Sequence, residues 1–482
     1  MGRRLAAAVL TLALAAGPGA AQEAFRPEPW LADLDQLRDA LSAGYANLDW
    51  QAERGMDLPG AYARAQTRIA AARDVYAARR VFDRFLASFA DGHLEVRWPT
   101  PPASTMPPPA AEPDLCARLG YFDVGDAGAI ATRLPGFRHV GRADAHLPAG
   151  VVAVAGRKVG VLRIPIFTPS GLPRLCDELL AQAKLTRQSA CDDACAARLV
   201  EAADTAFVEE MRGQVAALAA ERPDVLLIDI ADNGGGNDSP LALARLVTAR
   251  PVRRPPMALV RGAPAAEELA ARQVDVKAAL GSGPPAQQAA LARFDTDLTH
   301  AVAAARTACD RRPLWTGAAP GCSGLVDEPV YDGPLPPRTA GQALPDWVQV
   351  ASPTARFPAV TALWRGPLVV LGDWNSASSS ELFAAMVQDA GAAVVVGSRT
   401  FGAGCGHVTR AAPVMLANSG GVVSMPDCVR RRADGSNEVV GIQPDVAVGL
   451  QMYDSPRQRL ELVSAALPAA LDLAARRARA PE

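Results

Sequence analysis

The stretch Val225-Leu226-Leu227-Ile228-Asp229-Ile230 decides the fold class. It has almost no polar interruption, and an apolar strand of this length is typical of a sheet that is covered on both faces. Two further strands are predicted at 368–372 and 393–397, with a helix between them at 380–389. Strands and helices therefore alternate, which predicts an α/β layer structure.

The residues around that strand follow the same alternation, so we predict one α/β core over residues 151–482. Between about 251 and 362 the alternation lapses into a region rich in proline and alanine, which we interpret as a long insertion. Ser239 offers an N-cap, with Pro240 at the first helical position. The other predicted elements are a strand at 159–166 and helices at 196–220, 240–250 and, within the insertion, 286–309.

The first residues have the composition of a targeting segment. Arg3 and Arg4 precede an apolar run at 5–16, and small residues follow up to Ala21. This order is typical of a secretory signal peptide over residues 1–21, and the apolar run is too short to span a bilayer. No later stretch has the length and freedom from charge of a membrane helix. We therefore expect an exported protein, periplasmic or secreted, without a membrane span.

Residues 22–100 are predicted to form an N-terminal helical subdomain. Their apolar residues recur at steps of three and four, which is the period of an amphipathic helix. Proline is then concentrated between 99 and 113, where it disfavours both helices and strand pairing. We interpret residues 101–150 as a Pro-rich connector with one small segment, too short for a complete PDZ module that would bind the C-terminus of a substrate.

The composition excludes several classes of protein. With 482 residues, of which 49% are hydrophobic and 21% charged, the chain can bury a large core, so disorder is excluded. Lys+Arg 49 against Asp+Glu 51 gives a formal net charge of −2. This balance does not favour binding to nucleic acid or to another polyanion.

The eight cysteines agree with export, because an even number is compatible with disulfides in an oxidising compartment. The sequence does not determine their pairing, although Cys309 with Cys322 and Cys405 with Cys428 would each close a short loop. The Cys191-x-x-x-Cys195 spacing has no second Cys or His pair near it, so we predict no metal site and no cofactor. The remaining two are Cys116 and Cys176.

The stretch Ser376-Ala377-Ser378-Ser379-Ser380-Glu381 lies between a predicted strand and a predicted helix. Free backbone N–H groups and the positive end of the helix dipole meet at such a turn. A serine there is well placed as a nucleophile, provided that a base takes its proton and N–H donors face the developing charge. Helix capping by Ser379 or Ser380, with Glu381 in the first turn, explains the same residues without catalysis.

The second motif, Asp229-Ile230-Ala231-Asp232-Asn233-Gly234-Gly235-Gly236, ends the other buried strand. Three glycines let the backbone approach a ligand closely and present N–H groups, which suits an oxyanion hole. The glycine spacing is not that of the dinucleotide-binding fingerprint. An ordinary turn at the end of a strand is the alternative interpretation.

Together these two motifs, in this order, resemble the C-terminal-processing or tail-specific serine peptidase family. Gly397-Ser398-Arg399-Thr400-Phe401-Gly402-Ala403-Gly404 resembles the family loop Gly-x-x-Thr-(Phe/Tyr)-Gly-x-Gly. Gly441-Ile442-Gln443-Pro444-Asp445 resembles its final Gly-(Ile/Val)-x-Pro-Asp element, and Asp91-Gly92-His93 looks like the family too. The resemblance covers about residues 150–450 and implies a crotonase- or Clp-protease-like α/β core.

The resemblance implies Ser378 as the nucleophile and the N–H groups of Gly235 and Ser379 as oxyanion donors. In the processing branch of the family a lysine in the middle of the Phe-Gly-Lys-Gly loop is the base, but this chain has Ala403 there. The whole chain contains only three lysines, none in a matching motif, which argues against a Ser-Lys dyad. They are Lys158, Lys184 and Lys277.

The branch without the lysine includes tricorn core protease and resembles the interphotoreceptor retinoid-binding protein repeats. It uses a histidine before the core and a late glutamate, which match His93 as base and Glu438 as the carboxylate that orients it. His407 is the alternative base, and Glu381 is a further candidate. The non-catalytic interpretations are a structural His93 at a helix end and a solvated Glu438. Arg430-Arg431-Arg432 could attract a peptide carboxylate, but we favour the interpretation as a solvated strand end.

Three positions depart from the family pattern. Ala403 replaces the lysine, Gly92 stands where tricorn-like members have serine, and Ala231 stands where the family usually has arginine. The sequence predicts an exported serine peptidase that cleaves peptides or unfolded protein segments through a Ser378 acyl-enzyme. The alternative hypothesis is a non-catalytic peptide- or lipid-binding protein on the same fold, because a fold alone does not determine function.

Overall fold

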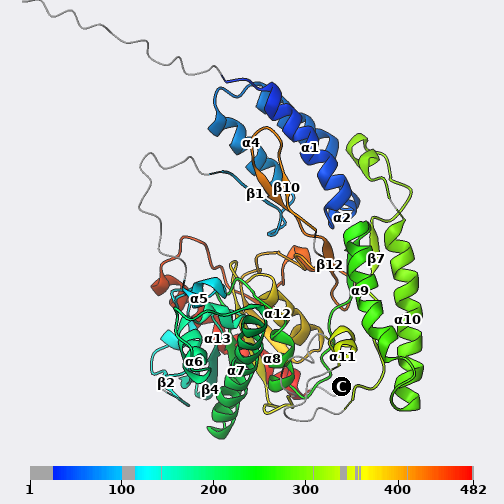
Figure 1. The fold of residues 1–482 in the computed structure, drawn as a ribbon. Coiled ribbons are helices and arrows are strands. Elements are labelled where there is room, and N and C mark those ends of the chain that lie inside the picture. The colour runs from blue at the N-terminus through cyan, green and yellow to red at the C-terminus, as the bar shows by residue number, and fades with distance from the viewer. Residues whose placement is uncertain are drawn as a thin grey trace, which may run out of the picture.

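The computed structural model describes residues 25–99, 114–142, 144–307, 309–336, 345–352, 357, 360–409 and 411–479. They form a mixed α/β fold around a seven-stranded sheet with the order β13-β9-β8-β5-β4-β3-β2 (Figure 1). Neighbours from β13 to β4 are parallel, and β3 and β2 join antiparallel. The predicted α/β layering is confirmed. The strands are β2 (Arg138–His139), β3 (Ala149–Val154), β4 (Arg157–Arg163), β5 (Val225–Asp229), β8 (Leu368–Gly372), β9 (Ala393–Gly397) and β13 (Val446–Ala447).

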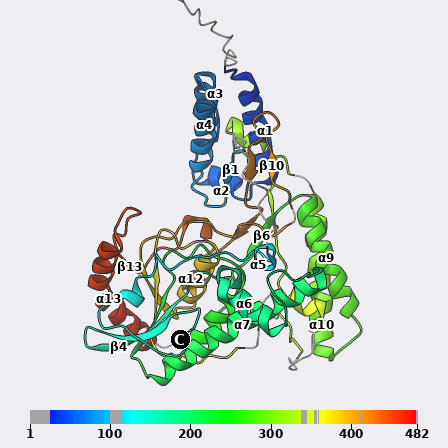
Figure 2. The same cartoon turned by 60° about the vertical axis from the view of Figure 1, so that its left-hand side comes forward.

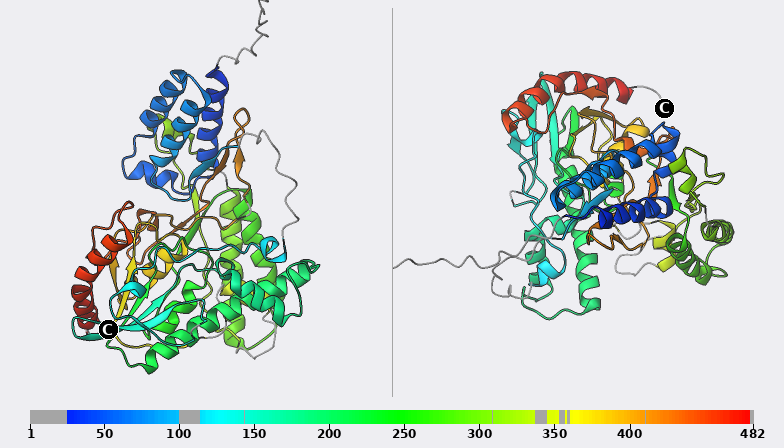
Figure 3. Two further views of the ribbon diagram at one scale, coloured as in Figure 1. Left: turned by 90° about the vertical axis from the view of Figure 1, so that its left-hand side faces the viewer. Right: turned by 90° about the horizontal axis from the view of Figure 1, so that it is seen from above.

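Helices cover both faces of this sheet, which is why its central strands β5, β8 and β9 are almost entirely apolar. Leu226 and Ile228 of β5 belong to one core cluster, and Val225 and Leu227 belong to the other. Figure 3 shows the long α7 and the C-terminal α13 on opposite sides of the sheet. On the α7 side lie α6 (Pro173–Gln182), α7 (Asp193–Ala220), α8 (Pro240–Val247) and α12 (Ser379–Asp389); α13 spans Pro456–Arg479. Short elements are α5 (Leu115–Arg118), η1 (Ala131–Arg133) and η2 (Pro169–Gly171).

The N-terminal helices pack around an apolar cluster of their own, above the main sheet in Figure 2. Two of them begin at aspartate N-caps, where Asp57 accepts a hydrogen bond from Gly60 N and Asp74 accepts one from Ala77 N. The same cluster takes in Trp315 of η3 (Arg312–Thr316), which is distant in sequence. The helices are α1 (Glu28–Gly44), α2 (Leu48–Glu53), α3 (Leu58–Ala70) and α4 (Val75–Ala87).

A β-hairpin packs against these helices. Its strands β10 (Val414–Met415) and β11 (Val422–Ser424) pair with each other, and β11 pairs with β1 (Glu95–Arg97), which follows α4. Asp33 of α1 is fully buried and accepts hydrogen bonds from the backbone N–H groups of Asn418 (2.9 Å) and Ser419 (2.7 Å) at the hairpin turn. The segment before β1, which contains His93, is therefore held against the core.

A second three-stranded sheet has the order β12-β6-β7. The sequence predicted one helix in this region at 286–309, but the structure also has a helix at 263–279. That helix buries mainly alanines, so its apolar stripe is too weak to stand out in the sequence. The elements are β6 (Met257–Val260), β7 (Leu325–Asp327), β12 (Cys428–Arg430), α9 (Ala263–Ala279), α10 (Pro285–Arg306), α11 (Asp346–Ala351) and η5 (Glu438–Val440).

Four disulfides use all eight cysteines. The two pairs expected from short loops, Cys309–Cys322 and Cys405–Cys428, are confirmed. Cys191 and Cys195 bond to each other, which explains their spacing without a metal. The fourth bridge joins Cys116 to Cys176. In the described part of the chain, no helix combines the length and the apolarity needed to cross a membrane. The predicted signal peptide, residues 1–21, and most of the Pro-rich stretch lie outside the described residues.

Candidate active site

Ser378 lies at the turn between β8 and α12, where it is the N-cap residue of the helix. Its φ is +53°, a backbone conformation that costs a non-glycine residue about 1–3 kcal/mol and that often marks a functional site. Ser378 is half-buried, whereas the flanking Ser376, Ser379 and Ser380 are buried. Ser376 Oγ donates to Ile230 O (2.8 Å) and Ser380 Oγ donates to Asn233 O (2.7 Å). Two neighbouring serines thus fix the turn from the glycine-rich side.

Gly235 is in contact with this serine turn. A Cβ at Gly235 would lie 2.8 Å from Ser378 Cβ and 3.0 Å from Ser379 N, so only glycine permits the approach, and its φ is +105°. The predicted proximity of Gly235, Ser378 and Ser379 is therefore present. The N–H of Gly235, however, donates to Asn233 Oδ1 at 2.9 Å. To donate to an oxyanion, the Gly235 N–H would first have to break its hydrogen bond to Asn233 Oδ1. The sequence did not predict this hydrogen bond.

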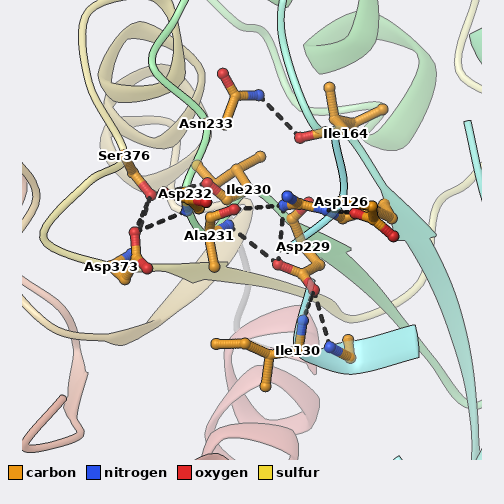
Figure 4. A network of polar contacts seen from close by, with 12 residues as sticks. Asp126, Ile130, Ile164, Asp229, Ile230, Ala231, Asp232, Asn233, Asp373 and Ser376 are labelled. Carbon is orange, nitrogen blue, oxygen red and sulfur yellow. Dashed lines mark hydrogen bonds and ion pairs between the residues drawn. The ribbon is translucent and has the colours of Figure 1, made fainter. Parts of the chain in front are cut away.

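Buried polar contacts hold the ends of the central strands in register (Figure 4). Asp229 is fully buried and accepts hydrogen bonds from the N–H groups of Ile130 (3.0 Å) and Ala131 (2.8 Å). Arg163 of β4 donates to the carbonyl of Ala231 at 2.5 Å and pairs with Asp229. The family usually has an arginine at the position of Ala231. In this chain the guanidinium that binds the turn comes instead from Arg163 of the neighbouring strand β4.

A carboxylate links the glycine turn to the serine turn in the same network. Asp373, directly after β8, accepts a hydrogen bond from Asp232 N at 2.9 Å and pairs with Arg459 of α13. The N–H of Asp373 in turn donates to Ser376 Oγ at 3.0 Å. Figure 4 shows Asp373 and Ser376 beside Asp232. The two motifs therefore form one hydrogen-bonded unit.

His93 lies against the loop of the third motif. Its Nδ1 is 2.6 Å from the carbonyl oxygen of Ala403, and a Cβ at Gly406 would lie 3.0 Å from the ring. Since a carbonyl can only accept, Nδ1 carries the proton, and in the neutral ring Nε2 has the free lone pair. The side chains of His93 and Ser378 are not hydrogen-bonded to each other in the structure.

Burial lowers the pKa of His93 below its usual range, against the opposing influence of the Ala403 carbonyl and of Asp91. The nearby charges of His407 and Arg430 lower the pKa further. Asp91 is buried, accepts hydrogen bonds from Tyr45 Oη (2.9 Å) and from the backbone N–H of His93 (3.1 Å), and therefore holds the backbone rather than the ring. The result is a histidine kept neutral in the base form.

Glu381 connects the serine turn to the loop that holds the histidine. Its carboxylate is fully buried and accepts hydrogen bonds from the N–H of Ser378 (2.9 Å) and of Ala403 (2.8 Å). It also accepts from Gly402 N (2.7 Å) and Thr400 Oγ1 (2.6 Å). Burial raises the pKa of Glu381, and these hydrogen bonds oppose that rise. Ala403 thus donates to Glu381 and accepts from His93, so three hydrogen bonds link Ser378 to His93 along this path.

Glu438 does not occupy the place that the sequence predicted for it. It is fully buried and pairs with Arg430, whose Nε donates to Glu438 Oε2 at 2.7 Å. Glu438 makes no hydrogen bond to His93, and the Ala403 carbonyl holds the ring instead. The prediction that Glu438 orients the imidazole directly is therefore wrong in this structure.

Arg430 is a buried residue of this site whose contacts sequence reasoning missed. It is buried, and its Nη2 donates to the carbonyls of Ser378 (3.1 Å) and Gly404 (2.9 Å). Our interpretation of this segment as a solvated strand end is wrong at Arg430 because β12 pairs with β6. Alternation along a strand could have found it, since Arg430 lies two residues after Cys428, whose disulfide to Cys405 faces the same loop.

His407, the alternative base, lies beside His93. The two ring centroids are 5.7 Å apart, and His407 is exposed, with Nε2 3.2 Å from Ser424 Oγ. Ser424 is opposite Glu95 in the pairing of β11 with β1. The structure therefore brings together both candidate histidines, and His93 is the more deeply enclosed of the two.

At Gly92, which departs from the family pattern, the Phe401 ring occupies the space that a side chain would need. A Cβ at Gly92 would lie 2.1 Å from the Phe401 ring. We predict that Gly92→Ser displaces the ring and the adjoining loop and lowers kcat/KM by about 100-fold, the cost of a misplacement near 1 Å. Gly213→Ser is the matched control, because a Cβ there meets nothing within 4 Å. Equal activity of the two variants in a peptide cleavage assay would contradict this explanation.

Comparison with known proteins adds two findings. The sequence model of peptidase family S41 matches residues 198–448. The solved structure of mature CPAF is 14% identical with a TM-score of 0.55, and the match covers 93% of this chain and 98% of that one. The structure of mature CPAF complexed with lactacystin is 13% identical with a TM-score of 0.54, over 93% and 99% of the two chains. At these identities, the likeness concerns the fold.

Proposed function

This chain belongs to peptidase family S41, and from that premise we propose that it is an exported serine peptidase. It hydrolyses peptide bonds in peptides or unfolded protein segments through an acyl-enzyme on Ser378. The observation that carries the proposal is the link from Ser378, strained at φ +53°, through Glu381 and Ala403 to a neutral His93. Four disulfides support the exported location, because such bridges persist in oxidising compartments.

In the first step, Ser378 Oγ attacks the carbonyl carbon of the scissile bond while His93 Nε2 takes the hydroxyl proton. The imidazolium then returns the proton to the leaving amine, and the acyl group stays on the serine. A water molecule, activated by the same nitrogen, releases the acid in the second half of the reaction. The Ala403 carbonyl holds Nδ1–H throughout, which keeps the tautomer that the base requires.

The oxyanion forms near the N-terminus of α12. There the Ser379 N–H lies in the positive end of the helix dipole, next to the close approach of Gly235. We assign Ser379 N–H as the first donor. Gly235 N–H becomes the second donor when it exchanges Asn233 Oδ1 for the substrate oxygen.

Arg430 and Glu438 act as a positioning pair for the nucleophile and the loop. Arg430 binds the carbonyls of Ser378 and Gly404, and Glu438 neutralises its buried charge. Glu438→Gln should destabilise the fold by about 3–5 kcal/mol, because it leaves a buried guanidinium without its counter-ion. The double variant Arg430→Met, Glu438→Leu should recover most of that stability but not the activity. Urea unfolding and peptide hydrolysis measure the two effects.

One result for Glu438→Gln would contradict its role as the counter-ion of Arg430. If Glu438→Gln keeps the stability of wild type and changes only the pH dependence of catalysis, Glu438 acts on the imidazole, as the sequence originally predicted.

The pH dependence of kcat/KM follows from the lowered pKa of His93. The base works only when neutral, so activity is lost as the pH falls through its pKa. We expect this acidic limb below pH ~6.5, the ordinary value for histidine. A lysine base would instead require alkaline pH, because only its neutral form accepts a proton. An acidic limb above pH 8 in a pH–rate profile would contradict a buried histidine base.

Incubation of the purified protein with casein and a peptide mixture tests the proposed function, with new termini identified by mass spectrometry. Cleavage by wild type and none by Ser378→Ala is the expected result. A well-folded protein that cleaves nothing, and that retains a bound apolar ligand through purification, would instead support the non-catalytic binding protein.

We also propose an architecture for the core, from the resemblance to the family. We assign a crotonase- or Clp-protease-like arrangement to residues 151–482, with 251–362 as an insertion and 22–100 as the helical subdomain. The parallel order β13-β9-β8-β5-β4 supports this assignment.

A further inference from the structure

A cavity of about 240 Å³ lies next to the glycine turn. One wall is the segment 168–170, which overlaps the start of η2, and another is the first part of α7 with Leu199, Val200 and Ala203. Tyr121 and Asn237 complete the lining that matters here. Asn237 follows Gly235 by two residues, so the cavity begins close to the turn that contacts Ser378.

The glycine turn connects the reacting serine to the cavity. Gly235 faces Ser378, and the next residue, Gly236, faces the backbone of Phe167, where a Cβ would lie 2.2 Å from the carbonyl oxygen. The N–H of Asn237 then donates to the same Phe167 carbonyl at 2.7 Å. Gly235 and Asn237 are two residues apart, so their Cα atoms are at most about 7 Å from each other.

The chemistry of the lining favours an apolar occupant. Four of its polar side chains bond in pairs: Asn237 Nδ2 donates to Asp204 Oδ1 at 3.0 Å, and the hydroxyls of Thr168 and Ser170 are 2.9 Å apart. What remains for a ligand is the apolar surface of the α7 side chains and the Tyr121 ring. The buried Asp204 disfavours an acidic group nearby. Burial, and to a lesser extent the charge of Asp204, raises the pKa of Tyr121 to about 12.

The size of the cavity favours a single side chain. Pockets for drug-sized ligands measure about 300–1,000 Å³, and this one is smaller. We infer that it is a specificity pocket that accepts an apolar side chain of valine to methionine size from a residue flanking the scissile bond. This inference rests on the proposed peptidase function and adds the class of substrate residue to it.

Val200→Trp tests the inference, because Val200 lines the cavity and is 51% exposed, so the larger ring narrows the mouth with little effect on folding. Ala202→Trp is the matched control, since Ala202 is exposed on the same helix, does not line the cavity and carries the same new side chain. Mass spectrometry of a cleaved peptide library gives the preference at each position around the cut. We expect the preference of wild type for Leu over Ala at one flanking position to fall about 10-fold or more in Val200→Trp and to persist in Ala202→Trp.

Two results would overturn the pocket while leaving the peptidase intact. One is an unchanged preference at both flanking positions in a folded Val200→Trp; the other is a wild-type preference there for acidic or basic residues. Failure of the proposed function is distinguishable, because the wild type would then cleave no peptide in the library. A melting curve for each variant establishes that it is folded.

Discussion

Ser378→Ala should reduce kcat/KM for peptide hydrolysis by a factor on the order of a million, the loss typical of removing the nucleophile of a serine protease. The hydroxyl is the only group at the turn that the account uses as a nucleophile, because Ser376 and Ser380 donate their hydroxyl protons to backbone carbonyls. Initial rates with a fluorogenic peptide measure the effect. Full activity of this variant would end the proposal.

Ser378→Gly separates activity from stability at the same position. Glycine adopts a positive φ without the cost that serine carries at +53°. We therefore expect a variant as inactive as Ser378→Ala but more stable than it by about 1 kcal/mol in urea unfolding.

His93→Gln should lower kcat/KM by about 10⁴- to 10⁶-fold, because the serine then has no base. His407→Gln is the matched control, since its ring lies 5.7 Å from that of His93 but is exposed and lies beside Ser424 Oγ rather than the Ala403 carbonyl. We expect the control to lose less than about 10-fold. Both variants are assayed at the pH optimum of wild type.

The reversed pattern has a definite meaning. Near-normal activity in His93→Gln together with a large loss in His407→Gln would assign the base to His407 and would make His93 a structural neighbour.

The layering of the core could be predicted from the sequence because burial on both faces leaves a direct signature. The apolar residues among 225–230 point alternately into two clusters, so Asp229 is the one polar residue of this stretch. The helix at 263–279 left no such signature, because alanine contributes little to an apolar stripe. The signal peptide and the Pro-rich residues 101–113 stay predictions, since they lie outside the described ranges.

The residues on the two turns could be predicted because their motifs are local. Gly235 and Ser379 lie together, as the order of strand, turn and helix indicated. The pair Arg430–Glu438 was missed, because the burial of Arg430 depends on the pairing of β12 with β6, two segments far apart in the chain. The role of Ala403 could not be predicted either. Its backbone N–H donates to Glu381 and its carbonyl accepts from His93, and neither contact depends on the side chain.

The departures from the family pattern have physical counterparts in this chain. Phe401 fills the space beside Gly92, and Arg163 binds the carbonyl of Ala231. Ala403 stands where the processing branch has lysine, and the carbonyl of Ala403 accepts a hydrogen bond from His93. These pairings are consistent with a site that uses a histidine base.

The central claim is that His93 activates Ser378, and the rate of labelling by a fluorophosphonate probe tests it most directly. Mass spectrometry of digested protein should locate the label on Ser378 of wild type. Labelling should be absent in Ser378→Ala, slowed by about 100-fold or more in His93→Gln and nearly unchanged in His407→Gln. A label on another residue, or labelling of Ser378 at the wild-type rate without His93, would contradict the account.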